Sequence, residues 1–222
     1  PPFPSPPLFR SSLAVLLVLL FHVDISWFAG GFIGVDVFFV ISGFLITGIL
    51  ARDNETGVFS FARFYYRRAR RLLPALFVTV GITFIAGALI FSPQHLEELS
   101  RSAIATIFSV SNIYFWTNSG YFDLGDHFKP LLHTWSLSVE EQFYLAWPMI
   151  IFVVAKSRSR SVLIGSLAFF AVVGYFASYY MTKVDSSTAF FLAPFRVFQF
   201  ALGGLLAFAP DTQKLPRIVC ET

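Results

Sequence analysis

The sequence predicts an all-α fold: a polytopic bundle of about six transmembrane helices with one re-entrant or interfacial segment. Composition is the first reason, because 56% of the 222 residues are hydrophobic and only 13% are charged, whereas a soluble domain carries about a quarter charged residues. The second reason is that apolar segments of membrane-spanning length follow one another along the chain. The third is that arginines gather in a short interval between two of them, which is typical of a cytoplasmic loop.

The apolar segments have roughly the 17 to 25 residues that a helix needs to cross a bilayer. We expect spans at residues 13–29, 32–51, 72–92, 134–155, 161–181 and 188–209. A shorter and more polar segment lies at 102–118. The transmembrane domain then covers residues 12–209 and is expected to be incomplete on its C-terminal side. We expect a disordered Pro-rich segment at 1–11 and a polar tail at 210–222.

Basic residues fix the predicted orientation. The arginines of the first cluster are Arg52, Arg63, Arg67, Arg68, Arg70 and Arg71. By the positive-inside rule this loop is cytoplasmic, so the N-terminus is cytoplasmic and the loop at 92–100 is external. Lys156, Arg158 and Arg160 indicate a second cytoplasmic loop. A full span at 102–118 would place that loop outside, so we expect this segment to be re-entrant or interfacial, with a polar cavity beside it.

Several function classes lack a signal. The arginine cluster fits membrane topology, so we expect no nucleic acid as a partner. Cys220 is the only cysteine, which excludes an internal disulfide and a thiolate metal cluster. The chain has no P-loop, nucleophile-elbow serine motif, zinc-protease motif or dinucleotide-binding glycine pattern. We expect no metal, and any chemistry must come from His, Glu and Arg side chains within the lipid.

Two ionisable residues lie in the first two predicted spans. His22 is ten residues into the first apolar segment, with Asp24 two positions later, and an imidazole can take a proton from a hydroxyl near neutral pH. The alternative is a histidine that is hydrogen-bonded between helices or lies at the interface. Asp36 lies just inside the second span, where Gly34 and Gly43 permit close helix approach. A site role for Asp36 and a packing helix with an interfacial aspartate both remain open.

The stretch FYYRRARRLLPAL at residues 64–76 places arginines at a helix start. Arg68 and Arg71 are three residues apart and therefore share a helix face. Paired guanidinium groups suit phosphate oxygens. A loop that only fixes topology is the alternative, and the density of arginines just before Pro74 favours a phosphate-bearing ligand.

The stretch HTWSLSVEEQFYLAWP at 133–148 carries a polar helix face. At about 100° per residue, one arc of about 80° contains His133, Ser136, Glu140 and Tyr144. Glu141 and Gln142 diverge from this arc. The face must point into the protein or a wet cavity, and a buried carboxylate needs a partner. Arg196 is the only arginine inside the later spans, so we expect a Glu140–Arg196 ion pair.

Four blocks, in this order, resemble the acyltransferase 3 family of bacterial membrane O-acyltransferases: LAVLLVLLFH, GGFIGVDVFFVISGFLIT, FYYRRARRLLPALF, and YFD followed by PLLHTWSLSVEEQFYLAWP. They are most similar to the branch that modifies O-antigen, other lipopolysaccharide sugars and related polysaccharides. The resemblance covers residues 12 to about 209. It implies transfer of an acyl group, commonly acetyl, from cytoplasmic acetyl-CoA to a hydroxyl of an extracytoplasmic glycan. It also implies a multi-pass protein of the bacterial cytoplasmic (inner) membrane.

The resemblance implies roles for individual residues. His22 matches the family's first-helix histidine and would activate the acceptor hydroxyl or relay the acyl group. Arg68 and Arg71 match the R-x-x-R pair and would hold the CoA phosphates. Glu140 matches the motif glutamate and would orient or protonate a partner. Supporting positions are Arg10, Asp36, His133, Ser136 and Arg196.

The sequence departs from the family pattern near its N-terminus. The family has an arginine eleven positions before its histidine, where this chain has Ser11, and Arg10 is twelve before. Eleven steps on a helix return to within about 20° of one face, whereas twelve miss it by about 120°. Arg10 either compensates through its length at a frayed helix end, or this copy is impaired. Two other functions stay open: a transporter or proton-coupled channel, and a non-catalytic fragment of an acyltransferase.

Overall fold

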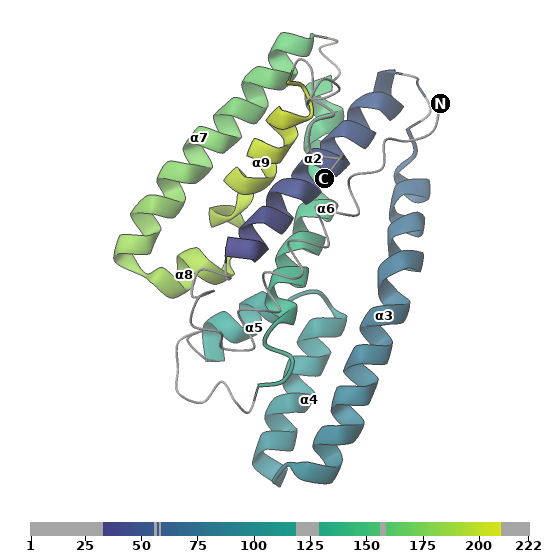
Figure 1. Ribbon diagram of the computed structural model, residues 1–222, viewed down its shortest axis with the longest axis vertical. Helices are drawn as coiled ribbons and strands as arrows, with labels where there is room; N and C mark the ends of the chain where they lie inside the picture. Colours follow the sequence, from purple (N-terminus) through teal and green to yellow (C-terminus); the bar gives the residue numbers. More distant parts are fainter. Residues whose placement is uncertain (1–32, 56, 58, 119–128, 156–158, 210–222) are drawn as a thin grey trace, which may run out of the picture.

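The computed structural model describes residues 33–55, 57, 59–118, 129–155 and 159–209 (Figure 1). All regular elements in these ranges are helices, which confirms the all-α prediction. They are α2 (Ile33–Glu55), α3 (Phe61–Ile90), α4 (Pro93–Ile107), α5 (Ser111–Asn118), α6 (Thr134–Ala155), α7 (Arg160–Val184), α8 (Ser186–Phe191), the 3₁₀ helix η3 (Ala193–Phe195) and α9 (Val197–Leu206). The predicted span at 13–29 and both predicted terminal segments lie outside the described residues.

Four of the described helices, α2, α3, α6 and α7, are long and apolar enough to cross a membrane. They match the predicted spans at 32–51, 72–92, 134–155 and 161–181. The helix that matches the predicted span at 72–92 begins earlier than predicted. Ser60 caps α3 by accepting a hydrogen bond from the Arg63 amide at 3.4 Å. Arg63, Arg67, Arg68, Arg70 and Arg71 therefore lie on the first three turns of α3 and not in a loop, and Arg52 lies in the last turn of α2.

The predicted sixth span at 188–209 does not form one helix. The chain breaks after α8 and again around η3, where Pro194 lacks the N–H that a continuing helix would need. The helix that follows, α9, has 10 residues. At about 1.5 Å per residue it is roughly half the thickness of the hydrocarbon core. In this segment α9 packs against α2 and α7 as a short apolar helix, and it is not among the described helices of membrane-spanning length.

Residues 92–118 also differ from the prediction in part. The expected external loop at 92–100 is largely helical, because Pro93 begins α4 at a position that favours helix starts. The helix ends at Ile107, and Ser109 adopts a positive φ of 56° before α5 begins. The chain between 102 and 118 thus comprises the end of α4 and all of α5, and its re-entrant or interfacial position stays a prediction.

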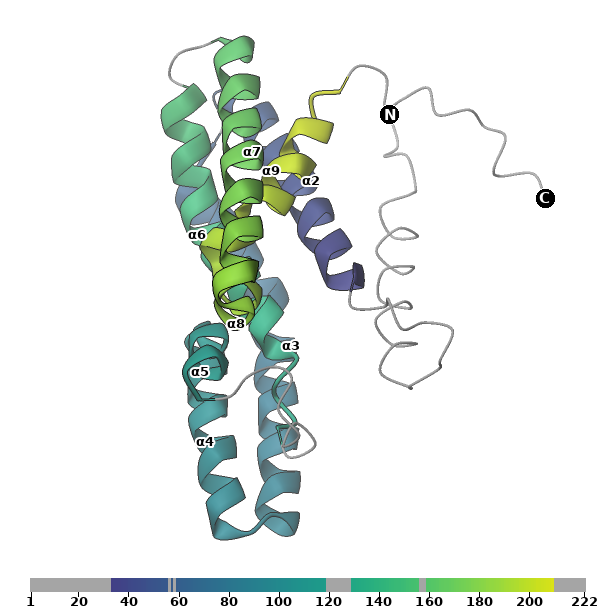
Figure 2. The same cartoon turned by 90° about the vertical axis from the view of Figure 1, so that its left-hand side faces the viewer.

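The long helices are arranged around α2 and α6. Figures 1 and 2 show α2, α6, α7 and α9 gathered at one end of the molecule, while the antiparallel α3–α4 hairpin extends beyond them at the other. Glycines bring α2 and α9 into backbone contact: a Cβ at Gly43 would overlap the backbone of Phe200, and one at Gly203 would overlap the Val40 carbonyl. The predicted close approach at Gly43 is confirmed.

Aromatic rings fill the core between α2, α6 and α9. Phe143 and Phe200 stack with centroids 3.9 Å apart, and Phe39 stacks on Phe200 at 4.8 Å. The Trp147 indole is 1% exposed and donates its Nε1–H to Thr47 Oγ1 at 2.8 Å. These contacts fix the rotation of α6, so that the polar residues one or two turns before Trp147 face α2 and α3.

Candidate active site

Glu140 on α6 is the acceptor at the centre of a small polar cluster inside the bundle. The Ser42 hydroxyl on α2 and the Tyr144 hydroxyl one turn along α6 both donate to its Oε1. Ser42 and Tyr144 are buried and Glu140 is half-buried. The predicted pairing of Glu140 and Tyr144 on one face of the helix is therefore confirmed, and Ser42 supplies the contact with a second helix.

Arg68 on α3 joins this cluster from the other side of α6. Its Nε–H donates to Glu141 Oε1 at 3.2 Å, and its guanidinium carbon lies 2.9 Å from the centroid of the Tyr144 ring. The Arg68 side chain is 19% exposed and that of Glu141 is 28% exposed. A guanidinium over an aromatic face is held electrostatically as well as by packing. One cation is thus fixed beside two adjacent carboxyl groups.

The register of α3 against α6 sets the depth of this cluster. Successive contacts pair Phe61 with Phe152, the Tyr65 hydroxyl with the Leu145 carbonyl, and Arg68 with Glu141. This pattern is antiparallel, and α6 continues 14 residues beyond Glu141 to Ala155, about 21 Å at the helical rise. Arg68 thus precedes the predicted span at 72–92 on its own helix but lies beside Glu141, which is inside the predicted span at 134–155.

The second predicted phosphate-binding arginine is placed differently. Arg71 lies one turn after Arg68 on α3 and is exposed, as are Arg67 and Arg70. The predicted pair thus shares a helix flank, but only Arg68 contacts the α6 cluster. The structure offers one arginine that is held in place and a second that is open to a ligand.

The predicted Glu140–Arg196 ion pair is wrong. Arg196 Nη1 donates to Asp36 Oδ1 on α2 at 3.0 Å, and its Nε donates to the Phe190 carbonyl at 3.0 Å. The break around η3 explains this, because it places Arg196 at the start of α9 beside the first turn of α2. Gln199 also donates to Asp36 Oδ1, at 2.9 Å. Asp36 is therefore half of an interhelical ion pair, apart from the residues bonded to Glu140.

The remaining predicted site residues are less central. His133 is exposed in the turn before α6, and the Ser136 hydroxyl donates to its carbonyl at 3.2 Å. On the predicted polar face, Ser136 in the first turn thus bonds to a backbone carbonyl, and the polar cluster begins at Glu140. His22 and Arg10 lie outside the described residues, so their predicted roles stay predictions.

Sequence reasoning missed the part that Glu141 plays. It placed Glu141 off the polar arc. In the structure Glu140 contacts α2, and Glu141, which points in another direction, contacts α3. Two adjacent glutamates differ by about 100° on a helix, so the doublet itself was a signal for two separate partners. Gln142 continues the series toward α5, where it exchanges hydrogen bonds with Asn112 at 2.8 and 3.3 Å.

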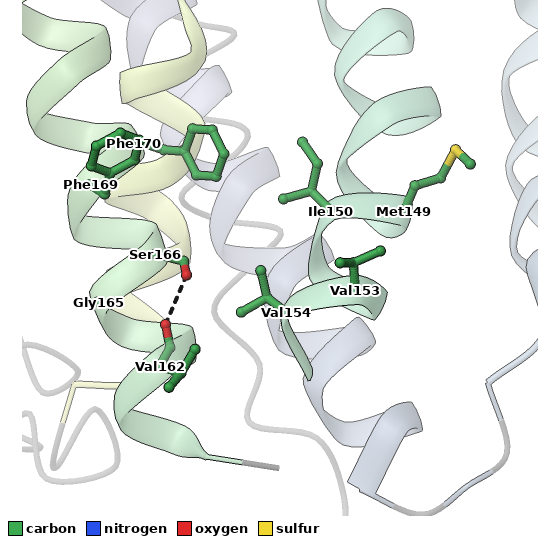
Figure 3. A pocket seen from close by; sticks show the side chains of 9 residues that line it. All are labelled: Met149, Ile150, Val153, Val154, Val162, Gly165, Ser166, Phe169 and Phe170. Carbon is green, nitrogen blue, oxygen red and sulfur yellow. Dashed lines mark hydrogen bonds between the residues drawn. The ribbon is translucent and has the colours of Figure 1, made fainter. Parts of the chain in front are cut away.

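A hollow between α6 and α7 has a different character. It measures about 680 Å³, and Figure 3 shows that its side chains are apolar apart from Ser166, which donates to the Val162 carbonyl of its own helix. Nothing in this lining can move a proton or hold an anion. Among the residues that the structure describes, no group of three His, Cys, Asp or Glu side chains could hold a metal ion.

Comparison with known proteins identifies the family. The model of an acyltransferase domain matches residues 12–218. The chain belongs to this acyltransferase family. It is 38% identical over 215 residues to the peptidoglycan O-acetyltransferase OatA of Listeria monocytogenes, covering 94% of this chain and 34% of the relative. It is 36% identical to the putative peptidoglycan O-acetyltransferase YrhL of Bacillus subtilis, covering 92% of this chain and 33% of the relative.

A third relative, the O-acetyltransferase OatA of Staphylococcus aureus, is 37% identical over 89% of this chain and 33% of its own length. The chain thus spans about a third of the length of these acyltransferase relatives. No solved structure matches. With several membrane-length helices, this acyltransferase-family chain is a multi-pass membrane protein.

Proposed function

We propose that this chain transfers an acetyl group from cytoplasmic acetyl-CoA to a hydroxyl of an extracytoplasmic glycan. The proposal places it in the bacterial cytoplasmic membrane with its N-terminus inside. One observation carries it: Arg68 contacts Glu141 and Tyr144, which together with Glu140 belong to the predicted span at 134–155, where ionisable groups are costly and usually mark function. Membership of the acyltransferase family supports this reaction class over the transporter alternative.

The names of the relatives support peptidoglycan as the glycan. The Listeria protein is named a peptidoglycan O-acetyltransferase and the Bacillus protein a putative one. Peptidoglycan therefore replaces the O-antigen and lipopolysaccharide sugars that the sequence resemblance suggested. The acceptor in the proposal is a sugar hydroxyl of the cell-wall glycan.

Arg68 and Arg71 are the proposed contacts for the phosphates of the donor. A guanidinium has five N–H donors, and of these the Nε–H of Arg68 is bonded to Glu141. The other four remain for an anion, and Tyr144 holds the group in one orientation, which lowers the entropy cost of binding. Arg71 adds a second cation one turn away.

The transfer itself needs a base, a thioester and a leaving thiolate. The acceptor hydroxyl gives its proton to a base, its oxygen bonds to the thioester carbonyl carbon, the C–S bond breaks, and the CoA thiolate takes up a proton. His22 is the proposed base, since imidazole has the right pKa range for this work. Glu140 is proposed to position this machinery, because it holds Tyr144 and, through that ring, the Arg68 guanidinium.

A transfer assay tests this function. The protein in lipid nanodiscs receives acetyl-CoA labelled in the acetyl group and a soluble peptidoglycan fragment, and ester-linked label on the glycan is counted. We expect transfer by the natural chain and at least a hundredfold loss in His22→Ala and in Glu140→Ala. His95→Ala, a histidine on α4, is the matched control and should keep its activity. Absence of transfer by the natural chain, with intact folding, contradicts the proposal, and uptake of a solute with protons would favour a transporter.

A further inference from the structure

A polar cleft lies between α4, α5 and the turn that follows residue 128. Its volume is about 340 Å³, within the range of roughly 300 to 1,000 Å³ that is usual for small-molecule sites. Polar side chains from all three segments line it: Gln94, Glu97, Glu98, Arg101, Ser102, Tyr114, Asn118 and Lys129. The positive-inside rule places these segments on the external face of the membrane, which is the side that a glycan would approach.

The lining combines the groups that recognise a sugar carrying both amide and charged substituents. Arg101 and Lys129 supply cations, and Glu97 and Glu98 supply carboxylates. Arg101 is paired with Glu97 at 2.7 Å across one turn of α4, an exposed pair that contributes little to stability and exchanges easily for a ligand carboxylate. Amide, hydroxyl and carboxylate groups together can satisfy sugar hydroxyls as both donors and acceptors.

Tyr114 gives the cleft an aromatic wall. Its ring meets the buried Phe115 ring edge-on at 5.3 Å, and its hydroxyl donates weakly to the Glu98 carbonyl at 3.4 Å. Burial, with a smaller effect of the nearby Glu98 carboxylate, raises the pKa of Tyr114 above its ordinary value. The phenol therefore stays neutral at physiological pH and can both donate to and accept from a sugar hydroxyl.

The opposite face of α5 is fastened to the helix that carries the active-site cluster. The Ser111 and Ser138 hydroxyls are 2.7 Å apart, and Asn112 bonds to Gln142, the residue next to Glu141. Ser111, Asn112 and Ser138 are all buried. A buried and satisfied polar network of this kind is rigid, so a ligand in the cleft would be held in a fixed relation to α6.

We propose that this cleft binds a segment of the glycan acceptor, an acetamido sugar that carries a carboxylate or peptide substituent. The proposal rests on the proposed acetyl transfer for the identity of the ligand. It adds the specificity-determining residues Arg101, Tyr114 and Lys129, which would recognise the acceptor on the external side. Bond-making would take place elsewhere, at the α2–α3–α6 cluster.

Direct binding tests the cleft without using the transfer reaction. A fluorescent peptidoglycan disaccharide is titrated into the full chain in nanodiscs with no acyl donor present. We expect Tyr114→Phe, which keeps the ring, and Lys129→Gln to weaken binding at least fivefold each, and the double variant at least twentyfold. Ser100→Ala on α4 is the matched control outside the cleft and should bind like the natural chain.

Acceptor kinetics separate this inference from the proposed function. In the transfer assay, the KM for the glycan should rise at least fivefold in the single variants while the KM for acetyl-CoA stays within twofold. Transfer by the natural chain with unchanged binding and unchanged acceptor KM in the variants would overturn the cleft and leave the enzyme. Disaccharide binding that the cleft variants lose, without any transfer by the natural chain, would leave the cleft and overturn the enzyme. Failure of the natural chain to bind the disaccharide would overturn the cleft.

Discussion

Arg68 is the arginine that the structure singles out among its neighbours on α3. It alone contacts Glu141 and the Tyr144 ring, whereas Arg70 is exposed. We expect Arg68→Gln and Arg71→Gln each to raise the KM for acetyl-CoA about tenfold or more, because a hydrogen bond to a charged group contributes about 1.5–3 kcal/mol. Arg70→Gln removes the same charge from another flank and should change this KM less than twofold. Equal effects of all three substitutions would mean that these arginines fix the orientation of the chain in the membrane and do not bind the donor.

The ion pair between Asp36 and Arg196 makes a second prediction at this scale. The Arg196 side chain is 13% exposed and that of Asp36 is 35% exposed. Asp36→Asn and Arg196→Gln should each lower the free energy of unfolding, while the double variant recovers part of the loss, with a coupling of roughly 1–3 kcal/mol. The exposed pair of Glu97 and Arg101 is the control, and its coupling should stay below about 1 kcal/mol.

Thermal unfolding of the natural chain and the three variants in one detergent measures this cycle. Additive losses at Asp36 and Arg196 would show that the two side chains do not interact in the folded protein. The same cycle run on Glu140 and Arg196 should be additive, since the structure gives these residues separate partners.

The sequence could single out residues that make polar contacts between helices but not how they pair. Asp36, Arg68, Glu140 and Arg196 were all identified, because charged groups in an apolar segment are conspicuous. The pairing of Glu140 with Arg196 failed because it assumed a continuous helix through 188–209. Only the break around η3 carries Arg196 to Asp36, and a single Pro in an apolar segment leaves that outcome undecided.

At the scale of the elements, the contact of α2 with α9 depends on Gly43 and Gly203. A methyl group at Gly43 would overlap the Phe200 backbone, whereas one at Gly81 on α3 would meet no atom within 4 Å. We expect Gly43→Ala to lower the free energy of unfolding by about 1–3 kcal/mol through overpacking. Gly81→Ala is the matched control and should raise it by up to about 1 kcal/mol, because alanine favours a helix.

Thermal unfolding followed by circular dichroism would measure the stability of both alanine variants. A Gly43→Ala protein as stable as the natural chain would mean that α2 and α9 are not in backbone contact. The sequence had suggested close approach at this glycine, but it could not name the partner, because α9 was not foreseen as a separate helix.

Helix existence was easier to predict than helix ends. Membrane-length apolar segments defined α2, α6 and α7 to within about two residues at most ends. The start of α3 was missed because hydropathy falls at its arginines, while the cap at Ser60 and the helix-favouring arginines extend the helix backward. The chain from 92 to 118 was divided by polarity alone, and a positive φ at Ser109 has no strong sequence signal.

At the scale of the whole molecule, the cluster lies where helices running in opposite directions cross. From Arg68, α3 continues 22 residues to Ile90, and from Glu141, α6 continues 14 residues the other way to Ala155. Together these arms measure about 54 Å at the helical rise, which exceeds the roughly 30 Å hydrocarbon core. The two arms together therefore extend beyond the bilayer, and the proposed passage places the contact of Arg68 with Glu141 within it.

This depth gives the cluster its proposed role. A charged group within the bilayer is stable only beside polar partners or water. Ser42 and Tyr144 supply such partners for Glu140, and Glu141 supplies one for Arg68. A donor that enters from the inside and an acceptor that enters from the outside would then meet near the middle of the membrane. The protein would serve as the passage that joins the two compartments.

Transfer across a sealed membrane tests this central claim most directly. Proteoliposomes with one orientation of the protein hold labelled acetyl-CoA on the side of residue 57 and a peptidoglycan fragment on the side of α4, and the label on the glycan is counted. We expect acetylated glycan on the far side, with its formation at least tenfold slower in Arg68→Gln. Transfer that occurs only when donor and acceptor share one compartment would contradict the account.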